Sequence, residues 1–114
     1  MKKRIYTITR SDLSIGQKSV QSAHALAQYL IDFNPHIDLK WNNGSIINLE
    51  LGNENSLKRW IKKLEAMGLE YSLFREPDLN HAITAIAVLH TGEIFKGIPL
   101  LKWYYEYHFI VVFK

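Results

Sequence analysis

Four short stretches of the chain have the composition and period of β-strands. Residues 4–9 alternate and are rich in β-branched and aromatic side chains, which predicts a strand. Residues 45–51 and 69–74 are interpreted in the same way. Residues 82–88 form an uninterrupted run of small and β-branched side chains, which is typical of a central strand covered on both faces.

Residues 17–33, between the first two strands, are predicted to form an α-helix. At about 100° per residue, this helix carries a stripe of uncharged polar groups beside an apolar face. The stripe consists of Gln17, Gln21, His24 and Gln28, and the apolar face of Val20, Ala23, Ala27 and Leu30. A single histidine is most simply explained as a hydrogen-bonded structural residue. The whole stripe nevertheless favours a functional site, because the non-core side of a helix is normally charged.

A second helix is predicted to begin with a cap at Asn55 or Ser56 and to end at Gly68. Its apolar positions have helical spacing, at Leu57, Trp60, Ile61, Leu64 and Met67. The opposite side is basic and consists of Lys58, Arg59, Lys62 and Lys63. Such a face is either solvated surface or a contact for phosphates.

The order of these elements, β, α, β, α, β, β, predicts an α/β domain with a small mixed sheet. Ligands of such sheets favour the loops beyond the carboxyl ends of the strands. Residues 10–16 and 75–81 are such loops, and the first helix begins at the same place. Residues 103–114 follow the domain of residues 1–102 as an apolar and aromatic segment. This segment is expected to pack on the domain or at a subunit interface.

The composition is that of a globular domain, with 114 residues, 47% hydrophobic and 22% charged. The absence of cysteine excludes disulfides and thiolate chemistry and fits a cytoplasmic location. No apolar run approaches the roughly 20 residues of a membrane span, so no membrane partner is expected. A formal net charge of +3 permits an acidic partner. The five histidines show no metal-ligand spacing, so no metal is expected.

Residues 16–25 read Gly-Gln-Lys-Ser-Val-Gln-Ser-Ala-His-Ala. They resemble the Gly-Lys-x-x-x-Gln-x-x-His-Ala signature of the type II peptidyl-tRNA hydrolases. Arg10-Ser11-Asp12-Leu13 resembles the Arg-x-Asp-Leu before it, and residues 84–88 resemble the family's threonine-led last core strand. The chain resembles one bacterial subgroup of this family more closely still. That subgroup has the pattern Asp-Leu-Ser-x-Gly-x-x-x-Val-Gln-x-x-His-Ala and, later in the chain, Phe-Arg-Glu-Pro-Asp-Leu.

This resemblance implies a three-layer α/β/α sandwich on a four-stranded mixed sheet, often dimeric. It implies hydrolysis of the ester that joins a peptide to the 3′ ribose of tRNA, without a cofactor. Gln21, His24 and Thr84 match the family pattern. Gln17 stands where the family has lysine, and Lys18 follows one place later. The loop after the third strand is shorter than the family's Asp-Ala-Gly-x-Thr, so either Glu76 or Asp78 takes the role of the aspartate.

Ester hydrolysis requires a water, a group that accepts its proton, and donors that face the oxyanion. His24 is the candidate base, because histidine exchanges protons near neutral pH, with Asp78 or Glu76 to orient it. Gln17, Gln21 and the N–H groups at the helix start are candidates for polarising the carbonyl or binding the 3′ end. Thr84 is a candidate for fixing the water or the ribose.

Binding of tRNA is expected to use side chains of the loops and helix start. The candidates are Arg10, Asp12, Lys18 and Arg75, with further phosphate contacts from Arg4, Lys58 and Lys62. Two other functions stay open: an RNA- or protein-binding module without catalysis, and a hydrolase or transferase acting on another acyl substrate.

Overall fold

The computed structural model describes residues 2–33 and 41–102. Four strands form one mixed sheet in the order β2-β1-β4-β3. The strands are β1 (Arg4–Thr9), β2 (Ile46–Glu50), β3 (Ser72–Glu76) and β4 (Ala82–His90). Strands β1 and β2 are parallel, and β4 is antiparallel to both β1 and β3. The predicted α/β fold with a four-stranded mixed sheet is confirmed.

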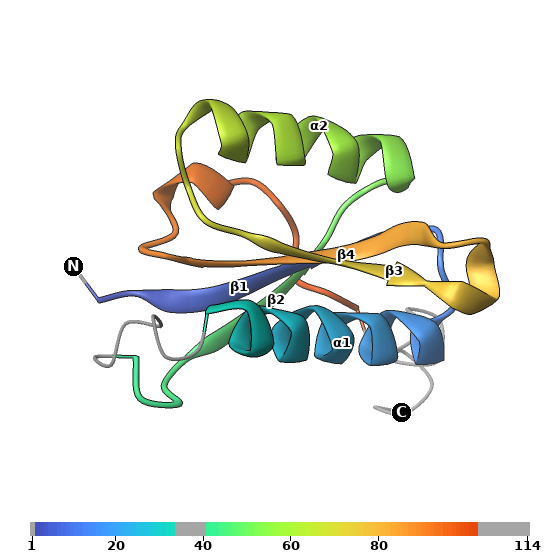
Figure 1. Cartoon of the computed structure of the whole chain (residues 1–114), viewed down its shortest axis with the longest axis horizontal. Helices are drawn as coiled ribbons and strands as arrows, with labels where there is room; N and C mark the ends of the chain where they lie inside the picture. Colours follow the sequence, from blue (N-terminus) through green and yellow to red (C-terminus); the bar gives the residue numbers. More distant parts are fainter. Residues whose placement is uncertain (1, 34–40, 103–114) are drawn as a thin grey trace, which may run out of the picture.

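The two helices lie on opposite faces of this sheet, α2 (Glu54–Ala66) on one side and α1 (Ile15–Phe33) on the other (Figure 1). The core beneath α2 contains Ile8, Leu57, Leu64, Ile86 and Phe95. The core beneath α1 contains Ile5, Ala25, Tyr29, Ala85 and Ala87. Strand β4 contributes to both cores, as its continuous apolar run predicts.

The ends of α2 follow local capping chemistry. Asn53 is the N-cap: its side chain accepts a hydrogen bond from the Ser56 N–H at 3.2 Å, and Ser56 Oγ accepts one from the Asn53 N–H at 3.3 Å. The predicted cap at Asn55 or Ser56 is therefore wrong, because the helix begins at Glu54 and both of these residues lie inside its first turn. Gly68 ends the helix as predicted, with a φ of 69° that favours glycine.

Two other boundaries differ from the predicted ones. Helix α1 begins at Ile15, because Ser14 caps it by accepting the Gln17 N–H on its hydroxyl at 3.2 Å. Strand β3 begins at Ser72 rather than at residue 69. The N–H of Leu69 still donates to Leu64 O at 3.0 Å, so this residue belongs to the end of the preceding helix.

The predicted apolar face of α1 is wrong at three of its four positions; the fourth, Leu30, is half-buried and packs against the core under α1. Val20 is 52% exposed, and Ala23 and Ala27 are exposed as well. The buried face consists of Lys18, Gln21, Ser22, Ala25 and Tyr29. Three of these five residues are polar, and strand side chains partner Lys18 and Gln21 across the interface. The prediction for residues 103–114 lies outside the described residues.

Candidate functional site

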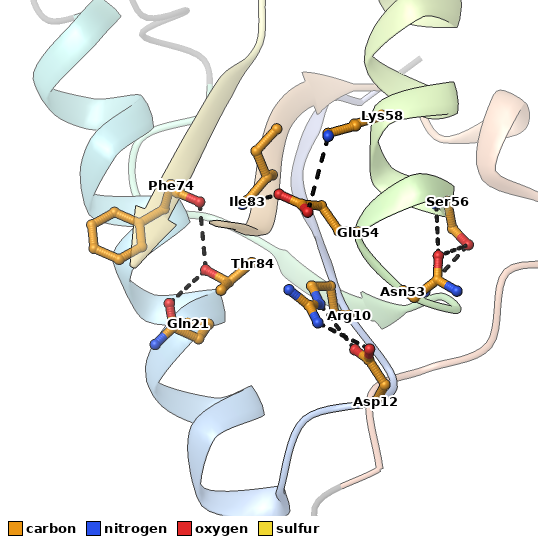
Figure 2. Close-up of polar contacts among 10 residues, drawn as sticks. All are labelled: Arg10, Asp12, Gln21, Asn53, Glu54, Ser56, Lys58, Phe74, Ile83 and Thr84. Carbon is orange, nitrogen blue, oxygen red and sulfur yellow. Dashed lines mark hydrogen bonds and ion pairs between the residues drawn. The ribbon is translucent and has the colours of Figure 1, made fainter. Parts of the chain in front are cut away.

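A polar network joins α1 to the ends of β3 and β4. The Thr84 hydroxyl donates to Gln21 Oε1 at 2.6 Å, and Gln21 Nε2 donates to Glu76 Oε1 at 2.8 Å. Figure 2 shows Gln21 reaching from α1 to Thr84 beside the Phe74 carbonyl. Gln21 is 2% exposed and Thr84 is fully buried. The glutamine amide is thus fixed at both its oxygen and its nitrogen, and it holds one carboxylate oxygen of the half-buried Glu76.

A β-bulge turns Thr84 toward α1. Phe74 pairs with Ala85, but Arg75 pairs with Ile83, so Thr84 is the extra residue of β4. Ile83 packs in the core under α2 and Ala85 in the core under α1, while Thr84 bonds to Gln21 of α1. Two consecutive side chains therefore face α1. Bulges commonly re-aim a side chain in this way beside functional sites.

His24 lies one helical turn after Gln21 and is exposed. Its ring stacks on the ring of Phe74, with centroids 4.3 Å apart and planes 10° apart. This contact fixes the ring plane and leaves the imidazole open to solvent. The expectation that Glu76 or Asp78 orients His24 is not met, because within residues 2–33 and 41–102 no carboxylate bonds to it. Glu76 bonds to Gln21 instead.

Lys18 is placed differently from the other predicted binding residues. Its ammonium lies 3.0 Å from Glu50 Oε2, and the two side chains are only 7% and 10% exposed. Burial by itself raises the pKa of Glu50, but hydrogen bonds from the Lys102 N–H, Lys18 and Ser11 together lower it below its ordinary value. In this arrangement Lys18 is a buried partner of a carboxylate and does not present its charge to a ligand. Gln17, one residue earlier, is exposed.

An open cleft of about 630 Å³ lies beyond the carboxyl end of β1, next to the loop that joins β3 and β4. It is lined by Arg10, Leu13, Glu54, Arg75, Asp78, Leu79, Asn80, His81 and Ala82. The cleft brings together the predicted residues Arg10, Arg75 and Asp78. Gln21, His24 and Thr84 do not line it, so the predicted site residues form two neighbouring groups.

Arg10 and Asp12 form a two-pronged ion pair at the mouth of this cleft, with both N–O distances at 2.9 Å (Figure 2). The hydrogen bond from Arg10 lowers the pKa of Asp12, and the same bond raises the pKa of Arg10. Much of the Arg10 charge is therefore already balanced. Within residues 2–33 and 41–102, the Arg75 side chain donates to the His81 carbonyl alone, at 3.2 Å, and it is exposed, so it is the more available cation for an anionic ligand.

Two features of this cleft were not predicted. Asn80 and His81 both have positive φ, 53° and 59°, which is uncommon for residues with a side chain and is often found at functional sites. Glu54 Oε2 accepts the Ile83 N–H at 2.8 Å and so ties α2 to the start of β4 (Figure 2). Asparagine favours turns, so the sequence contained a signal for the conformation of Asn80. Neither His81 nor Glu54 has a comparable local signal in the sequence.

The other predicted phosphate-binding residues are dispersed. Arg4 begins β1 and is paired in register with His90, so it lies at the end of the sheet opposite the cleft. Lys58 is 4.0 Å from Glu54 on α2, and Lys62 is exposed one turn farther along. These cations therefore do not line the cleft.

The fold and site define an α/β protein whose polar network lies at the carboxyl ends of β1 and β3. No family model matches the chain, and no curated protein matches it. The structure is similar to that of a protein of unknown function, Atu0240, from Agrobacterium tumefaciens str. C58. The TM-score is 0.62 at 14% identity, over 88% of this chain and 98% of that one. This likeness concerns the fold alone. No helix in the described part of the chain has the length and apolarity to span a membrane.

Proposed function

We propose that this protein hydrolyses the ester between a peptide, or a blocked amino acid, and the 3′ ribose of tRNA. The proposal rests on the resemblance of residues 10–25 and 84–88 to the type II peptidyl-tRNA hydrolases. The observation that carries it is the Gln21 amide held between Thr84 and Glu76, one turn from the exposed His24. Three residues that match the family motif thus lie at the meeting point of α1 and β4.

In the proposed reaction, His24 accepts a proton from a water that attacks the ester carbonyl. The bond to the 3′ oxygen then breaks, and the proton passes from His24 to that oxygen, which leaves a free 3′ hydroxyl and a peptide carboxylic acid that loses its own proton to solvent. Gln21 and Thr84 are positioning residues, because they are buried and hold the carboxylate of Glu76. Gln17, exposed in the first turn of α1, is a donor for the carbonyl oxygen.

The cleft would receive the tRNA end. Arg75 is exposed and suited to a phosphate, because its guanidinium donates in a planar fork. Arg10 would contribute less, since Asp12 already pairs with it. Contacts of this kind give affinity without sequence specificity, and the affinity falls as salt is raised.

The test is release of the acyl group from a blocked aminoacyl-tRNA by the purified protein. Wild type should exceed the buffer blank, and His24→Ala should lower the rate by about 10²- to 10⁴-fold. Gln28→Ala is the matched control, because this residue lies on the same stripe, and in the described part of the chain its side chain bonds to Asp32 of the same helix, at 2.8 Å, and not to the Gln21–Thr84–Glu76 network. Release equal to the blank, or equal rates for wild type and His24→Ala, would refute the proposed reaction.

A binding module without catalysis is the second candidate function. Two observations favour it: Gln17 replaces the family's lysine, and no carboxylate of the described chain contacts His24. In that case tRNA would bind in a salt-dependent manner without release of the acyl group, and Arg75→Ala would weaken binding while His24→Ala would not.

A further inference from the structure

A second hollow lies beside α2, on the side of the helix that faces away from the cleft. It has a volume of about 290 Å³ and is lined by Leu51, Ser56, Arg59, Trp60 and Lys63. Positions 56, 59, 60 and 63 recur at the spacing of one helix side, so this α2 pocket follows the length of the helix. Glu54, which lines the cleft, is about 200° from Ser56 around the helix. Figure 2 shows these two side chains on opposite sides of the first turn.

The α2 pocket carries two positive charges that are not paired with any carboxylate within residues 2–33 and 41–102. Arg59 donates to the Ser56 hydroxyl at 3.3 Å, and the Lys63 ammonium lies over the Trp60 ring, 4.4 Å from its centroid. Both cations are exposed. Neither contact neutralises a full charge, in contrast to the carboxylate that pairs with Arg10 at the cleft. The α2 pocket is therefore suited to an anion.

The indole of Trp60 gives the α2 pocket a flat apolar wall. Trp60 packs against the core under α2, and its ring centroid lies 5.4 Å from that of Phe95, so the ring is held in place. The flexible side chain of Lys63, rather than the core, lies over one ring face. A planar ligand group can take the place of this ammonium, because a cation–π contact at an exposed site is weak. The lysine is then available to an anion beside the ring.

We propose that the α2 pocket binds one unpaired nucleotide of RNA, with its base stacked on Trp60 and its two flanking phosphates bound by Arg59 and Lys63. An aromatic ring beside cations is the usual means by which proteins hold single strands. The inference rests on the proposed function, since the 3′ end of tRNA is unpaired. About one helix diameter, 10–12 Å, separates the cleft from the α2 pocket. A strand of a few nucleotides can therefore reach both.

Binding of an unacylated single-stranded oligoribonucleotide of cytidine and adenosine tests the phosphate contacts. Fluorescence anisotropy with the full-length protein gives the binding constant K at several salt concentrations. For Arg59→Gln/Lys63→Gln, the slope of log K against log[salt] should become less negative by about 1.4, because each phosphate contact of a single strand contributes about 0.7. Lys2→Gln/Lys3→Gln is the matched control: it removes the same charge from exposed residues before β1 and should keep the wild-type slope. No binding, or a wild-type slope for Arg59→Gln/Lys63→Gln, would overturn the proposal.

The stacking contact is tested separately. Trp60→Leu keeps an apolar side chain against Phe95 but removes the ring, and it should weaken binding by about 5- to 150-fold. In the wild-type protein, the indole N–H resonance of Trp60, assigned by its loss in Trp60→Phe, should shift when the RNA is added. The resonance of the buried Trp41 should not shift. An unmoved Trp60 resonance, or equal affinity for a fully paired RNA duplex, would overturn the proposal.

The two proposals fail in different ways. If the RNA shifts the Trp60 resonance but no acyl group is released, the hydrolase reaction is refuted and the α2 pocket stands. If the acyl group is released while the Trp60 resonance stays unmoved, the reaction stands and the α2 pocket is refuted.

Discussion

Replacing Lys18 with methionine should strongly destabilise the fold and separate a structural lysine from a substrate-binding one. The Lys18 ammonium and the Glu50 carboxylate lie 3.0 Å apart with side-chain exposures of 7% and 10%. Methionine keeps much of the length of the side chain but removes the charge. It would leave Glu50 buried, with the Lys102 N–H at 2.6 Å as a remaining donor.

The expected cost is about 3–5 kcal/mol, the usual result of removing one partner of a buried ion pair. This is a large part of the total stability of a domain of this size, which is about 5–15 kcal/mol. It corresponds to a fall in Tm of more than about 10 °C. Lys18→Met/Glu50→Met should recover much of the loss, because the apolar pair no longer contains an unpaired buried charge.

Urea unfolding followed by circular dichroism measures these differences. Lys62→Met is the matched control, because Lys62 is exposed, and its effect should stay within about 0.5 kcal/mol. If Lys18→Met lay within 1 kcal/mol of wild type and instead raised the KM for tRNA, Lys18 would be a binding residue and the burial argument would be refuted.

The pH dependence of this pair follows from the lowered pKa of Glu50. A carboxylate whose pKa is lower in the folded than in the unfolded state contributes stability above its ordinary pKa. That contribution is lost as the pH falls through the folded value. The stability difference between wild type and Lys18→Met should therefore be largest near neutral pH and should shrink in acid.

Three further variants test local features. Thr84→Val removes the hydroxyl that donates to Gln21 Oε1 and should cost about 1–3 kcal/mol in urea unfolding, together with a lower rate of acyl release; no effect on either would contradict the proposed network. Asn53→Ala should cost about 1 kcal/mol by loss of the N-cap, whereas Asn55→Ala should cost less, and the reverse order in thermal melts would contradict the assigned cap. Gly92→Ala should destabilise by more than about 1 kcal/mol, because φ is 107° and an added Cβ would meet Tyr6 Oη; an unchanged Tm would refute this.

The sheet and helices follow from local signals in the sequence. Strand-like composition and the turn residues were sufficient for β1, β2 and β4, and Gly68 marked the end of α2. The start of β3 was misplaced because the Leu69 N–H donates to the Leu64 carbonyl and so belongs to the end of α2. The pattern of hydrophobic residues does not reveal such a backbone hydrogen bond.

The burial of α1 could not be predicted from its own period. Lys18 is buried because Glu50 lies opposite it, 32 residues later, and Gln21 is buried because Thr84 bonds to it, 63 residues later. A helical wheel assigns polar residues to solvent, so it does not anticipate the burial of Lys18 and Gln21. The motif names both Gln21 and Thr84, which a hydrogen bond joins in the structure, but the bond between Gln21 and Glu76 could be found only from the three-dimensional arrangement.

The extra residue in β4 gives this strand two different phases along its length. From Ala85 onward its alternation serves the two hydrophobic layers, whereas Thr84 and Ile83 follow the opposite phase. Substitutions of comparable volume at Ile86 or Val88 should therefore change the side-chain packing under α2 and leave the hydrogen bond from the Thr84 hydroxyl to Gln21 in place. Deletion of Thr84 would restore the regular alternation, with Ile83 still under α2 and Ala85 under α1, and would remove the hydroxyl that bonds to Gln21. The bulge itself, more than the hydrophobicity of the neighbouring residues, therefore determines that the threonine faces α1.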